Sequence, residues 1–316
     1  MHRAFIVLLT AVLFSPWFAS TGSPGTPLSI SQLQGPGAAS PYEGQKLARP
    51  LRGCVTGVAA EGFFLQDPTG DGNPATSDGI YVYRYSAWKN PRRLKPGDLL
   101  ELSTYKVTEF YGQTELTGLP SDKNAAYHLL GKCALPAPAA LVPISDPQAD
   151  PAAQYERYEA MRVVVDLDAS VAGPTQRYES RYPAGDPELT LIPAGSPYYG
   201  RRIFADQLPV DRGTLALSGG LGVDLPGANV FDRVAAAGLT GVLAYQFGRY
   251  ILLVDNPAAI RVQPAATALP SISPAEDDEW TLCTFNAENL FDAVDDGDGD
   301  MGDWAPESDP AYRAGL

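Results

Sequence analysis

The densest group of potential metal ligands lies near the end of the chain, in the acidic run 295–307. Four of its carboxylates take positions 1, 3, 5 and 12 of an EF-hand-type calcium loop: Asp296, Asp298, Asp300 and Glu307. Position 6 of such a loop requires glycine for its sharp turn, and the residue there is Met301. The run therefore fits either a calcium site or a solvated acidic loop.

A second group combines aromatic and basic side chains, which suit a nucleic-acid surface. In the expected strand Gly79–Tyr83, Tyr81 and Tyr83 alternate with apolar residues, so one pair of side chains faces in and the other out. Outward aromatic rings can stack on bases. Arg92 and Arg93 follow closely and could meet phosphates. A packed β-surface beside a soluble basic loop explains the same pattern, and both interpretations stay open.

Strands rather than helices must position these residues. The chain has 316 residues, 45% of them hydrophobic, which is enough for two or three domains. Its 31 glycines and 29 prolines, with few stretches of helical periodicity, favour short strands joined by turns. The formal net charge is −14, but residues 271–316 alone carry 13 acidic side chains and one basic one. The preceding residues are therefore close to neutral, and the overall acidity does not exclude nucleic acid as a partner.

The chain begins with a segment typical of export. In residues 1–22 a basic patch, a short apolar run and a group of small residues follow one another, which is the order of a signal peptide. The apolar run is too short to span a bilayer, and no other segment has the character of a membrane span. We therefore expect a secreted protein with no membrane span once the signal is removed.

Two stretches rich in proline and alanine, residues 134–153 and 263–279, are typical of linkers because they lack apolar periodicity. They leave three segments, at residues 28–133, 154–262 and 280–316. The first segment is expected to form five strands, at Leu51–Val58, Gly62–Asp67, Gly79–Tyr83, Leu99–Glu109 and Gln113–Gly118. Five short strands of this kind suit a small closed barrel of the OB type, with an open sandwich as the alternative.

The second segment is also expected to be all-β. A β-rich strand begins near Met161, and a hairpin of Leu239–Gln246 and Arg249–Asp255 closes on Phe247-Gly248. Its size and order predict a second OB-like barrel. The third segment is too short for a core of its own, so we expect it to be the truncated start of another domain.

The cysteines predict one disulfide. An exported chain meets an oxidising environment, and the three cysteines are Cys54, Cys133 and Cys283. Cys54 lies in the first expected strand and Cys133 just after the fifth, regions that are neighbours in an OB barrel. Cys283 belongs to the next folding unit. We therefore predict a Cys54–Cys133 bridge.

The segment Thr281–Asp292 resembles the first strand of the endonuclease/exonuclease/phosphatase superfamily, the deoxyribonuclease-I-like fold, in which the strand ends in Phe-Asn. The pair here is Phe285-Asn286. The resemblance implies a four-layer α/β nuclease domain beginning near residue 280. It also implies that Asn286 enters a metal and phosphate site, although an asparagine that caps its own turn explains the residue as well.

Upstream segments strengthen this resemblance. Gly62–Tyr83 and Pro96–Leu116 resemble the accessory barrel of large secreted bacterial nucleases, and Tyr155–Val165 resembles the start of their second module. Ala160 departs from that pattern, in which glycine is expected. The resemblance implies a secreted, metal-dependent nuclease whose barrels bind or position DNA or RNA.

The catalysis that the resemblance implies needs a divalent metal, magnesium or manganese, together with a His–Asp pair that activates water. Residues 23–316 contain one histidine, His128, which we expect at the surface or in a loop. This chain is therefore expected to be inactive, whereas its full-length parent is expected to be an endo- or exonuclease. Two alternatives stay open: a non-enzymatic secreted protein that binds a surface glycan or protein, and a phosphoesterase with another substrate.

Overall fold

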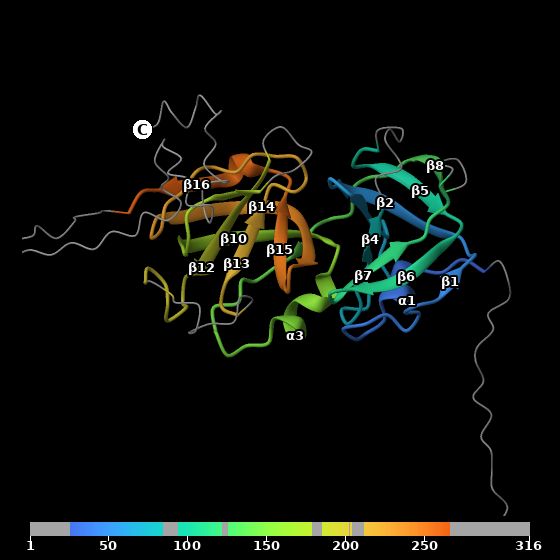
Figure 1. The fold of residues 1–316 in the computed structure, drawn as a ribbon, viewed down its shortest axis with the longest axis horizontal. Coiled ribbons are helices and arrows are strands. Elements are labelled where there is room, and N and C mark those ends of the chain that lie inside the picture. Colours follow the sequence, from blue (N-terminus) through green and yellow to red (C-terminus); the bar gives the residue numbers. More distant parts are fainter. Residues whose placement is uncertain are drawn as a thin grey trace, which may run out of the picture. The chain divides into compact units, whose positions relative to one another are not determined.

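The computed structural model describes residues 26–84, 94–121, 126–178, 185–201, 203 and 212–265. All of them lie within one compact unit, Met1–Ala266. The predicted signal peptide and the predicted start of a nuclease domain lie outside the described residues. The described part forms two sheets, each closed into a barrel (Figure 1). Among its helices, none is long and apolar enough to cross a membrane.

The first barrel has the strand order of an OB fold. Its strands, in chain order, are β2 (Leu51–Val58), β3 (Gly62–Gln66), β4 (Gly79–Tyr83), β5 (Asp98–Leu102), β6 (Tyr105–Phe110) and β7 (Gln113–Thr117). β2, β3 and β4 form an antiparallel meander, and β4 pairs in parallel with β7. β5 pairs with β2 and β6 with β7, so these two halves of one bent strand close the barrel. The five predicted strands are confirmed, except that the fourth is interrupted at Ser103 and Thr104.

Alternation along the strands separates the barrel interior from its outer face. Phe63 and Leu65 of β3, with Ile80 and Val82 of β4, point into the core, where all four are buried. A short helix, α1 (Ile30–Gln34), adds apolar side chains to the same core. Two further strands, β1 (Lys46–Leu47) and β8 (Tyr127–Lys132), extend the sheet at β6 and β5. His128 lies on β8 and is exposed.

The second barrel repeats the same strand order. Its strands are β10 (Arg162–Val171), β12 (Asp186–Pro193), β13 (Leu215–Ser218), β14 (Arg233–Gln246) and β15 (Arg249–Val254). β10, β12 and β13 form the meander, β13 pairs in parallel with β15, and β14 pairs with both β15 and β10. The topology confirms two tandem OB-like barrels in a mainly β protein. β11 (Gln176–Tyr178) and β16 (Ile260–Gln263) pair with β12 and β14.

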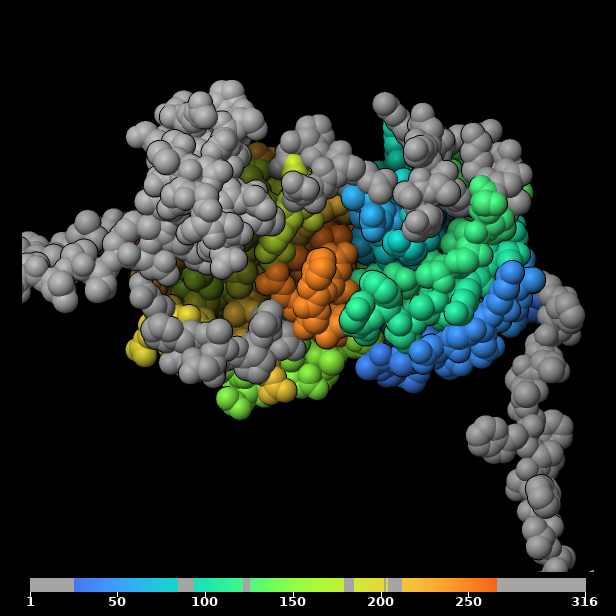
Figure 2. Space-filling view, in the orientation of Figure 1, coloured from blue at the N-terminus to red at the C-terminus, as the bar shows by residue number. Residues whose placement is uncertain are grey.

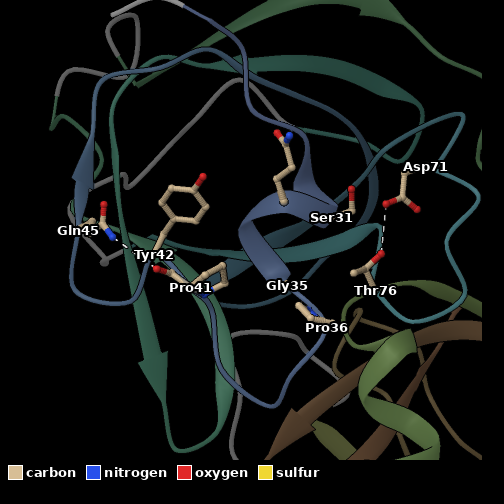
Figure 3. Close-up of a pocket in the computed structure, with 9 residues that line it drawn as sticks. Ser31, Gly35, Pro36, Pro41, Tyr42, Gln45, Asp71 and Thr76 are labelled. Atoms are coloured by element: carbon tan, nitrogen blue, oxygen red, sulfur yellow. Dashed lines mark hydrogen bonds between the residues drawn. The ribbon is translucent and has the colours of Figure 1, made fainter. Parts of the chain in front are cut away.

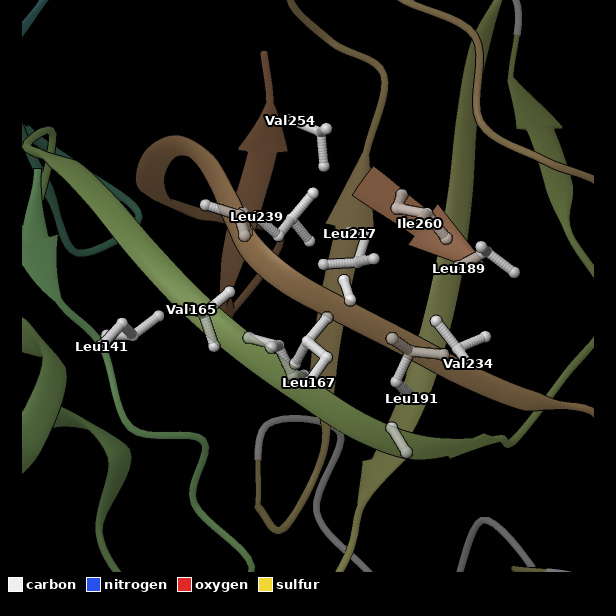
Figure 4. Close-up of a cluster of buried hydrophobic side chains, with 14 of the residues drawn as sticks. Leu141, Val165, Leu167, Leu189, Leu191, Leu217, Val234, Leu239, Val254 and Ile260 are labelled. Atoms are coloured by element: carbon white, nitrogen blue, oxygen red, sulfur yellow. The ribbon is translucent and has the colours of Figure 1, made fainter. Parts of the chain in front are cut away.

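The core of the second barrel also receives residues from the predicted linker 134–153. Figure 4 shows Val165, Leu191 and Leu239 of the barrel strands around one interior, with Leu141 at its edge. Leu141 and Ile144 are buried there, 4% exposed each. The segment also contains β9 (Ala139–Ala140), which pairs in parallel with β10. Two short helices, α3 (Pro151–Tyr155) and η1 (Glu156–Tyr158), lead into β10, and η2 (Pro257–Ala259) precedes β16.

The predicted disulfide is present in the first barrel. Cys54 on β2 is joined to Cys133, with the Cα atoms 6.0 Å apart and 79 positions between the two residues in sequence. The bond holds the chain that leaves β8 against the first barrel strand. Cys283 lies outside the described residues.

Candidate ligand cleft between the barrels

The outer face of β3 and β4 is apolar and packs against the second barrel. Phe64 and Tyr81 form a buried cluster with side chains of β13, β14 and β15, among them Val242 and Leu253. The rings of Phe64 and Tyr81 lie 4.9 Å apart between centroids. The two barrels therefore share a hydrophobic core at their junction.

This packing changes the role predicted for Tyr81. The ring faces away from its own barrel, as alternation requires, but it is only 7% exposed because the second barrel covers it. In this arrangement Tyr81 presents no open face for stacking on a base. Tyr83 is half-buried and lies at the edge of the same cluster. Arg92 and Arg93 lie outside the described residues, as do Asn286 and the predicted calcium ligands Asp296, Asp298, Asp300 and Glu307.

Polar bonds across the junction fix the two barrels against each other. The Ser77 hydroxyl donates to the Glu159 carbonyl oxygen at 2.5 Å, and the Thr114 amide donates to Glu159 Oε1 at 3.0 Å. The Arg162 amide donates to Gln66 Oε1 at 2.8 Å. These bonds join groups far apart in sequence, so the junction is held by direction-dependent contacts as well as by apolar packing.

Backbone segments also approach closely at this junction. A Cβ on Gly79 would lie 2.4 Å from the carbonyl carbon of Ala160, so only glycine fits at that position. Ala160 itself has a φ of 58°, in the left-handed region that favours glycine. The expectation of glycine at 160 thus has a structural reason, although the chain places a buried alanine there.

A cleft of about 1000 Å³ opens beside the buried junction. Its described lining includes Phe110 and Tyr111 from the β6–β7 turn, Phe247 and Gly248 from the β14–β15 turn, and Glu115 of β7. Figure 2 shows atoms of the β6–β7 region and of β15 meeting at this junction. The cleft is large enough for a small planar ligand, and it has aromatic side chains from both barrels.

The two aromatic turns are built alike. Tyr111 and Gly112 have φ values of 50° and 91°, and Phe247 and Gly248 have values of 53° and 78°. Both turns are therefore two-residue hairpin turns with two left-handed residues, for which Asn-Gly and Asp-Gly are the usual sequences. A bulky residue at positive φ carries a backbone cost. Tyr111 is nevertheless 81% exposed and Phe247 88% exposed, so neither ring compensates for that cost by burial.

The β6–β7 turn also contacts the second barrel. A Cβ on Gly112 would lie 2.9 Å from the Tyr245 ring, which shows how closely this turn approaches β14. Tyr245 in turn packs against Tyr250, with 4.9 Å between ring centroids. Tyr111 is thereby held at the edge of the cleft by contacts of its neighbour rather than by contacts of its own ring with the second barrel.

The charge lining the cleft is acidic. Glu61, Glu115 and Asp186 are among the described lining residues, which include neither lysine nor arginine. Burial raises the pKa of Glu115 to about 7, and the nearby carboxylate of Glu109 adds to that rise. Burial likewise raises the pKa of Tyr81, so its hydroxyl stays neutral.

Glu159 is fully buried at the junction. Burial raises the pKa of its carboxyl well above the ordinary range, and the nearby charge of Glu156 adds to the effect. Its Oε2 has no hydrogen-bond partner within the described part of the chain. Glu156 accepts a hydrogen bond from the Tyr250 hydroxyl at 2.5 Å, and burial raises its pKa as well. The junction therefore contains carboxyl groups that favour the protonated form.

A smaller hollow of about 620 Å³ lies beside α1 (Figure 3). Tyr42, Gln45 and Asp71 line it, and the Thr76 hydroxyl donates to Asp71 at 3.2 Å. The carboxylates of the 67–78 loop bind the loop's own backbone: Asp67 accepts from Gly70, and Asp71 accepts from Asn73. Turn formation accounts for these aspartates. Over the residues that the structure describes, no cluster of three metal-binding side chains occurs.

The sequence predicts the Phe247-Gly248 turn, and it predicts a connection between the strands Leu99–Glu109 and Gln113–Gly118, but it assigns neither a role in binding. The signal that points to them is the residue before each glycine. Hairpin turns with two left-handed residues usually have asparagine or aspartate there, whereas Tyr111-Gly112 and Phe247-Gly248 have aromatic residues. Only the structure shows that both turns border one cleft.

No family model matches the chain, and no curated protein matches it. Solved structures with some similarity include the tetrameric p202 HIN2, with 11% identity, a TM-score of 0.25, and coverage of 70% of this chain and 96% of that chain. The p204 HINb domain has 9% identity, a TM-score of 0.24, and coverage of 69% and 97%. Fission yeast Pot1, solved with ssDNA, has 12% identity, a TM-score of 0.20, and coverage of 73% and 87%. These similarities are too low to assign a function, which has to be inferred from the cleft.

Proposed function

We propose that the tandem barrels bind single-stranded nucleic acid in the cleft between them. The observation that carries this proposal is the pair of exposed aromatic residues, Tyr111 and Phe247, held at positive φ on equivalent turns beside one cleft. In OB folds the loop between the fourth and fifth strands takes part in binding oligonucleotides and oligosaccharides. Both turns occupy that position. Aromatic rings there can stack on bases of any sequence.

The test is binding of labelled single-stranded DNA and RNA, about 12 nucleotides long, to the full chain, followed by fluorescence anisotropy. The double substitution Tyr111→Ala/Phe247→Ala should weaken binding at least about tenfold, because stacking contributes ~1–3 kcal/mol per base. Tyr178→Ala is the matched control, since Tyr178 is also exposed at 53% but does not line the cleft. Undiminished binding by the double variant would overturn the proposal.

The acidic lining gives one alternative a specific basis. Carboxylates such as Glu61 and Asp186 suit ligands rich in hydroxyl groups, and OB folds also bind oligosaccharides. If the protein instead binds a surface glycan, it should bind to oligosaccharides immobilised on an array. Labelled oligonucleotides should then show no change in fluorescence anisotropy when the protein is added. That outcome would replace the nucleic-acid proposal with the glycan one.

We further propose that the barrels serve an exported, metal-dependent nuclease. The support is the resemblance of Thr281–Asp292 and of the upstream modules to secreted bacterial nucleases. In this proposal residues 1–22 direct export, Asn286 belongs to the metal and phosphate site, and a divalent metal promotes phosphodiester hydrolysis. Residues 23–316 contain only His128 as a candidate base. The 316-residue chain should therefore bind nucleic acid without cleaving it in magnesium or manganese, and metal-dependent cleavage by this chain would contradict that expectation.

A further inference from the structure

Glu115 is an acceptor directed toward the cleft without a partner. It lies on the outer face of β7, lines the cleft and is only 5% exposed. The carboxylate has no hydrogen-bond or ion-pair partner among the described residues. Its oxygens are not among the buried, unpartnered side-chain atoms of the described residues, so we take them to open onto the cleft. A carboxylate that opens onto a cleft accepts hydrogen bonds from whatever enters it, which suits a ligand with hydrogen-bond donors.

The groups around Glu115 restrict the chemistry of that ligand. Tyr81 lies directly beside it on β4 in the parallel pair, and Glu109 lies near it on β6. Glu61 and Asp186 add negative charge to the cleft. Phosphate groups are repelled by this lining, whereas neutral N–H donors are attracted. The aromatic turns at the edge favour a ligand with a flat face.

From this geometry we infer that Glu115 reads the Watson–Crick edge of a single nucleobase, guanine above the others, while the phosphates of the strand stay outside the cleft. The inference rests on the proposed function. Guanine offers two adjacent donors on that edge, N1–H and the N2 amine, which match the two oxygens of one carboxylate. Thymine and uracil offer a single imino donor between two carbonyl oxygens that the carboxylate repels. Bases in single strands are commonly read on this edge.

The pKa of Glu115 predicts how the preference for guanine should depend on pH. Burial raises that pKa to about 7, so the carboxyl is partly protonated near neutral pH. Only the ionised form offers two acceptor oxygens to guanine. The preference for guanine should therefore increase as the pH rises through about 7, whereas stacking by the turns should change little over the same range.

The experiment compares thymidine oligonucleotides that contain one central guanine, inosine or thymine, bound to the full chain from about pH 6 to about pH 8. At the higher pH we expect the guanine oligonucleotide to bind about tenfold more tightly than the thymine one, the range of a bidentate contact. Inosine, which lacks the N2 amine, should fall between them. Glu115→Gln should abolish the preference for guanine and its pH dependence. Glu43→Gln, a change at an exposed glutamate, should leave both unchanged.

The outcomes separate the two proposals. Equal binding of guanine and thymine oligonucleotides, with sensitivity to Tyr111→Ala/Phe247→Ala retained, would overturn the role of Glu115 and leave the cleft as a binding site without base preference. Equal weakening of all three oligonucleotides by Glu115→Gln would identify a structural role and would also overturn the inference. Absence of binding by any oligonucleotide would instead refute the proposed function itself.

Discussion

The two barrels share one strand order but differ on the outer face of their second strand. In the first barrel β3 presents Phe64 outward, and that ring is completely buried against the second barrel. In the second barrel the equivalent strand, β12, carries Glu188, which is ion-paired with Arg249 of β15. The outer face with an apolar ring has to be covered by another surface to be removed from water. The outer face with charged side chains forms its ion pair within its own barrel. A shared topology therefore determines neither which surface docks nor which surface binds a ligand.

The turns between the fourth and fifth strands differ less, and that difference is also informative. Tyr111 has an aromatic neighbour, because its ring lies 4.8 Å from that of Phe110 between centroids. Phe247 has no ring packed against it among the described residues. In both turns an aromatic residue has a positive φ although its ring is exposed. Strain without compensating burial fits a binding role better than a role in folding. The comparison predicts that changes at the junction affect stability strongly, whereas changes at the turns affect binding.

Removing the disulfide should produce the largest effect. The Cys54→Ala/Cys133→Ala variant opens a loop of 79 positions, and chain-entropy reasoning gives a loss of about 4 kcal/mol in the free energy of unfolding. Because the barrels share a buried core, both should unfold in one transition at a lower urea concentration. Equilibrium unfolding followed by near-ultraviolet circular dichroism of the buried tyrosines, which lie in both barrels, and by far-ultraviolet circular dichroism checks this expectation. Two separate transitions in the parent protein would show that the barrels fold independently of their junction.

The second prediction tests the junction directly. Gly79→Ala places a methyl group 2.4 Å from the backbone of Ala160, which cannot move without separating the barrels. We expect a loss of about 3 kcal/mol, at the upper end of typical overpacking effects. Gly227→Ala is the control, because a Cβ at that exposed glycine meets nothing within 4 Å. Equal midpoints for the two variants in urea unfolding would mean that the close contact at Gly79 is not needed for the fold.

The third prediction concerns pH. The folded-state pKa of Glu159 lies above the value of about 4.3 for an unfolded glutamate, so the folded state binds the proton more tightly. The stability that this proton provides is complete below the unfolded pKa and is lost as the pH rises toward the folded pKa. Glu159→Gln keeps an acceptor for the Thr114 amide and removes the charge. The variant should match the parent in the free energy of unfolding near about pH 4 and should be the more stable of the two near about pH 8.

Measurement of the urea midpoint at each pH checks this sign. Glu43→Gln, at an exposed glutamate, provides the comparison. A parent protein whose stability rises steadily from about pH 4 to about pH 8, with Glu159→Gln less stable at every pH, would show that the ionised carboxylate stabilises the junction.

The sequence was sufficient for the strands of the first barrel because these depend on local patterns, and the expected barrel then placed Cys54 beside Cys133. In Gly79–Tyr83 the alternation of Ile80 and Val82 with the two tyrosines separates the inward from the outward side chains, and turn residues mark the ends of strands. β12 was missed: its Pro187 and Pro193 resemble turn signals, although its interior residues Leu189 and Leu191 are buried in the core.

The cleft could not be predicted because it depends on contacts between barrels. Alternation showed that Tyr81 faces outward, but it could not show that β14 and β15 cover the ring. The burial of Glu115 has the same origin, because its strand position alone suggests an exposed side chain. Long-range packing of this kind leaves no periodic trace in one sequence.

The smallest expected change in the free energy of unfolding comes from substitutions at the two strained turns, and these substitutions test whether the aromatic residues there serve binding. Tyr111→Asn and Phe247→Asn place at each turn a residue that tolerates the left-handed conformation, so each should relieve part of the backbone cost. We expect Phe247→Asn to raise the free energy of unfolding by about 0.5 kcal/mol, because Phe247 is 88% exposed and its removal costs little packing. Tyr111→Asn should be closer to neutral, since it also loses the ring contact with Phe110. Both variants should bind single-stranded oligonucleotides more weakly than the parent. Such a gain in stability with a loss of binding is the trade-off expected of a binding site, whereas lower stability in both variants would show that the aromatic residues at these turns stabilise the fold.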